Sequence, residues 1–246
     1  MNKSIIVTGA SRGIGAQIAK DFAKAGYNVL INYNNSEADA IKVKEEINKN
    51  NPNVIAEIYK CNVQNLDECE QMARFAISIF GKIDVLVANA GIAQIKPLID
   101  VSKEDINNFI GVNLVGVINS CKAVCENMIS NKFGRIIAIS SMWGIYGSSC
   151  EAPYSAAKAG VIGFCKALSK ELGPSNITVN TICPGLIETS MNSSLSKETI
   201  DEIVSSIPLG RIGTPSDVSS LAVFLASSNA SYITGATIQV DGGIIL

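Results

Sequence analysis

The sequence predicts an α/β fold: a doubly wound parallel sheet of about seven strands with helices on both faces. Short apolar runs alternate with helical patterns along all 246 residues, which is typical of strands linked by covering helices. The runs are apolar almost throughout, as strands buried on both faces are. A glycine-rich turn joins the first run to the first helical pattern. No change of composition or Pro/Ser-rich linker marks a boundary, so residues 1–246 are expected to form a single domain.

Composition and charge exclude several classes of protein. Hydrophobic residues make up 47% of the chain, a normal globular share. The net charge of −2 and the sequence pI near 5.3 argue against nucleic acid or an anionic membrane as the main partner. The chain contains no His, which removes Ser-His and Cys-His catalytic groups and ordinary zinc hydrolase sites, and no metal is expected.

The start of the chain and its cysteines indicate a cytoplasmic location. The first residues are expected to run directly into a strand, with no signal or transit peptide. No apolar run is expected to reach the ~18 residues needed to span a bilayer. The seven Cys are scattered without a C-x-x-C pair, which indicates reduced thiols. Cys121 and Cys125, four residues apart, are interpreted as core residues rather than as a metal-binding pair.

The first strand, turn and helix indicate a dinucleotide site. Residues 4–8 are a β-rich apolar run, 9–15 a glycine-rich turn, and 16–24 a helical pattern. This is the first half of a Rossmann-type βαβ unit, in which glycines allow close backbone approach and the helix N-terminus faces a pyrophosphate. An ordinary glycine turn is the alternative. The expected cofactor contacts in the turn are Gly9, Ser11, Arg12, Gly13, Ile14 and Gly15.

The end of the second strand, residues 28–33, favours NADP(H) over NAD(H). An NAD site expects Asp or Glu there to bind the ribose 2′-hydroxyl. This chain instead has Asn and Tyr, followed by Asn34 and Ser36, and no carboxylate that would repel a 2′-phosphate. Arg12 in the glycine turn is a cation that can reach such a phosphate. Asn34 and Ser36 are therefore expected cofactor contacts. The alternative is that Arg12 is only solvated and the site accepts NAD.

The remaining elements follow the same alternation. Helices are expected over 36–50 (capped by Ser36), 66–80, 102–132 (capped by Ser102), 154–172 and 215–227, and strands over 54–61, 83–88, 135–140, 177–182 and 237–240. Residues 188–206 are polar and irregular in character, with Thr189, Ser190 and Asn192 near their start, and are expected to form a mobile lid.

Polar or glycine-containing turns follow several of the expected strands. Ligands of open parallel sheets bind at the carboxyl ends of the strands, so these turns are expected to contact the cofactor, although each is also readable as a plain turn. Asn113 lies on an apolar helical run, where a buried amide must bond to water or backbone, or serve a site. The turn residues are Asn62, Val63, Asn89, Ala90, Gly91, Pro184 and Gly185, followed by Ile187 and Thr189.

Ser141, Tyr154 and Lys158 form the candidate catalytic group. Ser141 follows a buried strand, and Tyr154 and Lys158 are four residues apart on the next helix, which places them on one face. Moving a phenol pKa from ~10 to about 7 requires roughly 4 kcal/mol. A cation about 4 Å away supplies an energy of that order at an effective dielectric of about 20. Tyr154 is therefore the candidate acid/base, with its pKa lowered by Lys158, and Ser141 would bond the substrate oxygen. The alternative is a surface Tyr–Lys pair and a strand-end Ser.

Together these motifs resemble the short-chain dehydrogenase/reductases. The resemblance rests on the glycine turn, Asn89-Ala90-Gly91, Asn113, Ser141, Tyr154-x-x-x-Lys158 and Pro184-Gly185, and covers nearly the whole chain in the family's order. The segments Pro208-Leu209-Gly210-Arg211, Tyr232-Ile233-Thr234-Gly235 and Asp241-Gly242-Gly243 resemble the 3-oxoacyl-[acyl-carrier-protein] reductase branch.

The resemblance implies a function and a catalytic tetrad of Asn113, Ser141, Tyr154 and Lys158. It implies that Tyr154 donates the proton, Ser141 fixes the carbonyl, Lys158 also binds the ribose, and the Asn113 backbone holds a water of a proton relay. It further implies that Ile187 and Thr189 meet the nicotinamide carboxamide. The implied activity is NADPH-dependent reduction of a ketone, 3-oxoacyl-[acyl-carrier-protein] to 3-hydroxyacyl, in fatty acid biosynthesis, by a homotetramer built on the Asn113 and Tyr154 helices and the last strand.

Some residues depart from that branch and leave other functions open. Lys132 and Ser175 stand where carrier-protein reductases often place Arg near the mouth of the site, so carrier docking is expected to be weaker. The residues around Trp143 and Glu151 also resemble a reductase of 5-aminopentanone-modified elongation factor P, and Glu151 would attract an amine. A hydroxysteroid or polyol dehydrogenase and a non-catalytic dinucleotide sensor or scaffold are the further alternatives.

Overall fold

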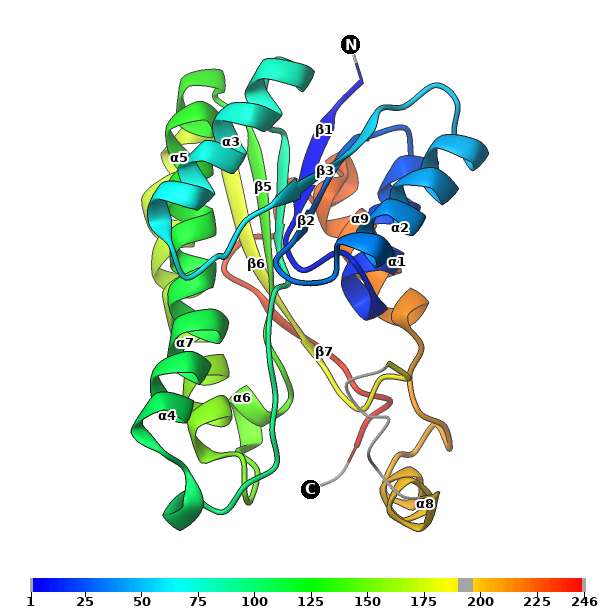
Figure 1. Ribbon diagram of the computed structural model, residues 1–246, viewed down its shortest axis with the longest axis vertical. Coiled ribbons are helices and arrows are strands. Elements are labelled where there is room, and N and C mark those ends of the chain that lie inside the picture. The colour runs from blue at the N-terminus through cyan, green and yellow to red at the C-terminus, as the bar shows by residue number, and fades with distance from the viewer. Residues whose placement is uncertain (1, 190–196, 245–246) are drawn as a thin grey trace.

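The computed structural model of the protein, which describes residues 2–189 and 197–244, contains a seven-stranded parallel sheet in the order β3-β2-β1-β4-β5-β6-β7. The expected α/β fold is therefore confirmed (Figure 1). The chain reverses its direction of strand addition between β1 and β4, and this switch is where doubly wound sheets bind ligands. The strands are β1 Ser4–Val7, β2 Asn28–Tyr33, β3 Ala56–Lys60, β4 Val85–Ala88, β5 Gly134–Ile139, β6 Ile177–Pro184 and β7 Thr237–Val240.

Helices cover both faces of the sheet (Figure 1). One face carries α1 Gly13–Lys24, α2 Glu37–Asn50 and α9 Pro215–Ala226; the other carries α3 Leu66–Phe80, α4 Lys103–Ile110, α5 Gly116–Asn131 and α7 Ala152–Leu172. Side chains alternate between these layers along each strand: Ile5 and Val7 belong to one core, and Ile6 between them belongs to the other. Short helical pieces complete the described chain: η1 Leu98–Asp100, η2 Gly111–Val115, α6 Trp143–Tyr146, η3 Gly173–Ser175, α8 Lys197–Ser205 and η5 Ser228–Ala230.

Both predicted Ser residues are N-caps, but only one of them makes a side-chain cap bond. Ser102 and Asp105 form a reciprocal capping box, with the Ser102 hydroxyl accepting from the Asp105 N–H at 3.0 Å and Asp105 accepting from the Ser102 N–H at 2.9 Å. Ser36 precedes α2 but makes no side-chain cap bond. Ser36 is therefore the N-cap residue as predicted, but its φ and ψ, −99° and 64°, lie outside the extended region typical of N-caps, and its hydroxyl does not bond the helix end.

The helix expected over 102–132 is interrupted by a π-helical turn. The segment η2, Gly111–Val115, separates α4 from α5 and contains Asn113, which is fully buried. Such wide turns are frequent at functional sites because they change the direction in which side chains project.

The run Lys103–Asn131 is also long and apolar enough, at 29 residues, to cross a membrane by length and composition alone. The expectation that no stretch would meet that criterion is therefore wrong. Of its most apolar window, 44% is buried inside the protein, where α5 contacts α3, α7, β4 and β5. One such helix is weak evidence for a membrane span, because core helices of globular proteins pass the same test.

The region expected to be an irregular lid contains a helix. The segment α8, Lys197–Ser205, places Ile203 against Met142, Ile207 and Ile244 in a small apolar cluster. The segment is polar overall, but its few apolar residues recur at the spacing of an amphipathic helix, a pattern that the prediction of an irregular lid overlooked. Ser190 and Asn192, named with the lid, lie outside the described residues.

Candidate active site

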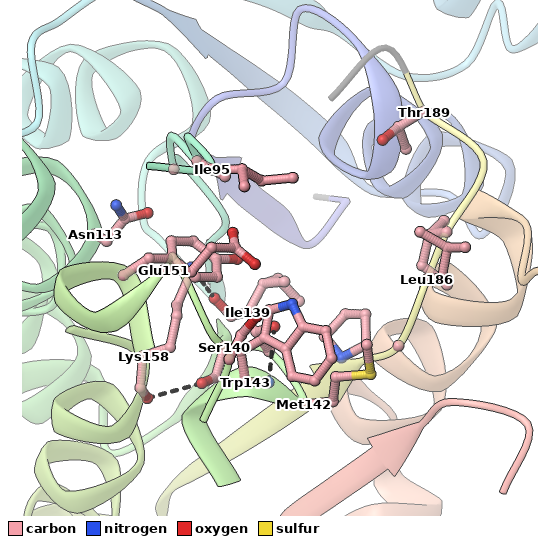
Figure 2. A pocket seen from close by; sticks show the side chains of 18 of the residues that line it. Ile95, Asn113, Ile139, Ser140, Met142, Trp143, Glu151, Lys158, Leu186 and Thr189 are labelled. Carbon is pink, nitrogen blue, oxygen red and sulfur yellow. Dashed lines mark hydrogen bonds between the residues drawn. The ribbon is translucent and has the colours of Figure 1, made fainter. Parts of the chain in front are cut away.

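A pocket of about 390 Å³ lies at the carboxyl ends of β4, β5 and β6. It is lined by the catalytic candidates and by part of the predicted cofactor set, so segments far apart in the sequence meet there (Figure 2). Those predicted residues are Ile14, Asn89, Gly91, Asn113, Ser141, Tyr154, Lys158, Pro184, Gly185, Ile187 and Thr189.

The three catalytic candidates converge in this pocket. Ser141 lies just beyond β5, after Ser140, and its Oγ accepts the Trp143 N–H at 3.2 Å. Pro153 occupies the first turn of α7, and Tyr154 and Lys158 follow one turn apart on that helix with exposures of only 9% and 3%. The helix is fastened to the strand because the Ser140 hydroxyl donates to the Lys158 carbonyl at 2.8 Å.

The ionisation of Tyr154 and Lys158 differs from the prediction. Burial is the main cause that raises the pKa of Tyr154 to about 12, while the Ser141 hydroxyl lowers it and the Glu151 charge raises it. Burial likewise lowers the pKa of Lys158 to about 8. The Lys158 ammonium donates to the Ile139 carbonyl at 2.9 Å and lies 5.6 Å from the Tyr154 ring centroid. The expected lowering of the phenol pKa is therefore wrong, since desolvation dominates.

Both the oxygen and the nitrogen of the Asn113 side chain form hydrogen bonds with neighbouring backbone groups. Its Oδ1 accepts the Ile92 N–H at 3.1 Å, and its Nδ2 donates to the carbonyls of Ile92 at 2.9 Å and Phe109 at 3.1 Å. A Cβ on Gly91 would lie 2.8 Å from Asn113 Oδ1, so a side chain at that position would break this arrangement. Asn113 thus joins the segment after β4 to the π turn, and its side chain is satisfied by backbone rather than by substrate.

The glycine turn is built as a cradle against the end of β4. Gly9 has φ +62°, and a Cβ there would lie 2.8 Å from the Ala90 Cα. A Cβ on Gly15 would lie 2.5 Å from Asn89 Nδ2. Asn89 Nδ2 in turn donates to the carbonyls of Thr8 at 2.9 Å and Gly9 at 3.1 Å. Arg12, the exposed residue before α1, provides no side-chain cap, so the first N–H groups of that helix are left to meet a ligand. The cradle fits a dinucleotide pyrophosphate.

Asn32 is a buried residue of this region that the sequence reasoning missed. Its Oδ1 accepts the Gly9 N–H at 3.1 Å, and its Nδ2 donates to the carbonyls of Tyr33, Tyr59 and Cys61 at 3.2, 3.3 and 3.0 Å. It therefore fastens the glycine turn to the ends of β2 and β3. The available signal was an Asn inside an otherwise apolar strand, where a polar group needs partners.

The remaining cofactor candidates lie outside the lining of this pocket. Asn62 Oδ1 accepts the Gln64 N–H at 3.1 Å, which supports its interpretation as a turn residue. Val63 is buried, and its carbonyl accepts from Asn119 at 3.0 Å. Asn34 is exposed and Ser36 is half-buried. The candidates outside the lining are Gly9, Ser11, Arg12, Gly13, Gly15, Asn34, Ser36, Asn62, Val63 and Ala90.

Lys132 and Ser175 do not lie near the mouth of the pocket of their own chain. Lys132 is the C-cap of α5, shortly before β5 begins at Gly134, and Ser175 lies in η3, shortly before β6 begins at Ile177. They therefore occupy the amino edge of the sheet, whereas the pocket lies at the carboxyl edge. The expectation for these positions is wrong within one chain, because both precede the strands that lead to the site.

Comparison with known proteins agrees with the geometry. A family model described as Enoyl-(Acyl carrier protein) reductase matches residues 9–245. The chain belongs to the short-chain dehydrogenase/reductase family and is an oxidoreductase that acts on ketones. Within that family it is similar to 3-oxoacyl-[acyl-carrier-protein] reductase FabG of Staphylococcus epidermidis, 42% identical over 246 residues and 100% of both chains. It is also similar to FabG of Chlamydia muridarum, 43% identical over 244 residues, 99% of this chain and 98% of the relative.

Proposed function

We propose that the protein reduces 3-oxoacyl-[acyl-carrier-protein] to the 3-hydroxyacyl product with NADPH, in fatty acid biosynthesis. The observation that carries the proposal is the convergence of Ser141, Tyr154 and Lys158 in one pocket at the carboxyl edge of the sheet. Relatives that share the full length of the chain and bear that activity in their names support the substrate.

The chain's own residues account for the proton transfer. The Ser141 hydroxyl and the Tyr154 phenol both bond the ketone oxygen, and the phenol gives its proton as negative charge develops there. Burial keeps Tyr154 protonated before the reaction, because it raises the pKa of the phenol to about 12. After the transfer the adjacent Lys158 would stabilise the phenolate, and a water held by the Asn113 backbone, as the family resemblance implies, would take part in reprotonation.

The residues present fit a nicotinamide dinucleotide. The glycine turn and the N-terminus of α1 would hold the pyrophosphate, Lys158 the ribose, and Ile187 and Thr189 the carboxamide. When bound, this cofactor supplies the hydride that reaches the carbonyl carbon.

Two features support NADP(H) over NAD(H). Arg12 is exposed beside the glycine turn and can meet a 2′-phosphate. Glu37, the first carboxylate after β2, accepts the Tyr33 hydroxyl at 2.8 Å through Oε1 and is thereby engaged elsewhere. Arg12→Ala is expected to weaken NADPH binding with little effect on NADH.

The test is NADPH oxidation with a panel of acyl thioester, amino-ketone, steroid and sugar ketones. Turnover of 3-oxoacyl thioesters supports the proposal. Fast turnover of another ketone with no turnover of any acyl thioester would contradict the proposed acyl thioester substrate. Cofactor binding without turnover of any ketone would indicate a dinucleotide sensor or scaffold.

A second candidate function, which Glu151 favours, is the reduction of an amine-bearing ketone such as 5-aminopentanone attached to elongation factor P. Glu151 lies at the pocket (Figure 2). It is the only carboxylate among the described residues that line it. Burial raises its pKa, which a nearby ammonium would offset. Glu151→Gln is expected to reduce kcat/KM for amino-ketones and to spare neutral acyl substrates. An equal effect on both substrates would contradict this candidate.

The assembly proposed is a cytoplasmic homotetramer. Ile106, Val115 and Ile129 on the α4–α5 run are apolar side chains that are 40%, 38% and 38% exposed, and a partner subunit packed on this run would cover them. Sedimentation of the purified chain would test it, and a monomer at micromolar concentration would contradict it.

A further inference from the structure

A pair of buried thiols lies next to Asn62 and Val63, two of the predicted cofactor contacts. Cys61 follows β3 and Cys69 lies in α3, and their exposures are 1% and 0%. The Cys61 thiol donates to the Cys69 sulfur across 3.8 Å. The two residues bracket Asn62 and Val63 in the chain, and neither thiol has a part in the proposed ketone reduction.

We propose that hydrogen peroxide converts Cys61 and Cys69 into a reversible disulfide, and that this disulfide weakens dinucleotide binding. The second half rests on the proposed cofactor site. The sulfurs already face each other, and closing the bond brings them from 3.8 Å to about 2.05 Å. The thiols of all seven Cys are free, and these two are hydrogen-bonded to each other.

Cys69 is the sulfur that reacts first. The Cys61 hydrogen bond lowers the pKa of Cys69, and the thiolate is the reactive form. It attacks one peroxide oxygen, the O–O bond breaks, and the departing hydroxide takes the Cys69 proton as water. The product is a sulfenic acid on Cys69. The Cys61 sulfur then attacks the Cys69 sulfur, the S–O bond breaks, and the second hydroxide leaves with the Cys61 proton. Two thiols lose two electrons and one peroxide becomes two waters.

The disulfide is connected to the proposed cofactor site by hydrogen bonds on two sides. Cys69 donates through its thiol to the Val63 carbonyl at 3.5 Å, and oxidation removes that bond. On the other side the Cys61 carbonyl accepts from Asn32 at 3.0 Å, and Asn32 accepts the Gly9 N–H at 3.1 Å. Closing the disulfide is therefore expected to displace the turn at Asn62 and Val63, the glycine turn, or both.

The experiment uses the full chain with Cys125→Ser and Cys150→Ser, which removes the two thiols that are not fully buried. After peroxide treatment, peptide mass mapping is expected to find Cys61 linked to Cys69 with the loss of two hydrogens. The Kd for NADPH is expected to rise about tenfold and to return on reduction with dithiothreitol. The same background carrying Cys61→Ser is expected to keep its affinity through the same treatment.

Three results would overturn the proposal. The first is no Cys61–Cys69 link in the treated protein, a result that needs no variant at those positions. The second is a complete link with unchanged NADPH affinity. The third is an equal loss of affinity in the Cys61→Ser protein. If the untreated protein bound no NADPH, the proposed function and the cofactor half would both fail, while peptide mapping would still decide whether the disulfide forms.

Discussion

The Lys158 ammonium donates a 2.9 Å hydrogen bond to the Ile139 carbonyl, so α7 and β5 are joined by the side chain that the reaction needs. The same ammonium is 5.6 Å from the centre of the Tyr154 ring. Because the group is buried and its pKa is lowered to about 8, the folded chain without cofactor binds its proton less tightly than the unfolded chain does.

Lys158 should make the cofactor-free protein more stable as pH rises from about 8 towards 10.5, its ordinary pKa. In that window the unfolded chain binds more protons, and stability then increases with pH. Urea unfolding of wild type and Lys158→Met at pH 8 and pH 10 measures this contribution. Between pH 8 and pH 10 the free energy of unfolding should increase more for the wild type than for Lys158→Met. The same pH dependence in both proteins would contradict the lowered pKa of Lys158.

Tyr154→Phe should lower kcat by about 10²-fold or more, because general acid catalysis contributes an effect of that size. NADPH affinity should change little, since the ring and its packing remain. Initial rates and NADPH fluorescence titration measure the two effects. Tyr232→Phe is the matched control, because Tyr232 is fully exposed at 102% and should keep wild-type kinetics. Wild-type turnover by Tyr154→Phe would contradict the role of the Tyr154 phenol as the general acid.

Asn113→Asp should disturb the site through backbone geometry. The carboxylate can still accept the Ile92 N–H, but it cannot donate to the carbonyls of Ile92 and Phe109 as the amide does at 2.9 and 3.1 Å. Leaving such groups unpaired costs roughly 1–3 kcal/mol of stability. The midpoint temperature of thermal unfolding and kcat should both be lower than in the wild type. Asn131→Asp, at an exposed amide that bonds the Asn127 carbonyl at 2.7 Å, is the control and should cost less.

The sequence predicted those parts of the molecule that depend on local periodicity. Alternating apolar runs are enough to predict the parallel sheet, and i, i+4 spacing is enough to place Tyr154 beside Lys158. The π turn at Asn113, the bonds of Asn32 and the pKa directions depend on what is packed around each group. Those surroundings come from segments distant in the chain, such as Ile92 for Asn113 and Gly9 for Asn32.

Gly9→Ala should damage the cofactor cradle by a clash as well as by backbone strain. Gly9 has φ +62°, and an added Cβ would lie 2.8 Å from the Ala90 Cα, an atom that cannot move without shifting the end of β4. Gly26→Ala is the matched control, because Gly26 has φ +88° and nothing within 4 Å of the added Cβ. The control should lose about 1–2 kcal/mol of stability from the left-handed backbone alone. Gly9→Ala should lose more stability and most of its NADPH affinity, by urea unfolding and fluorescence titration. Equal losses in the two variants would show that glycine is needed at position 9 because of its left-handed backbone, and not because the glycine turn lies close to the end of β4.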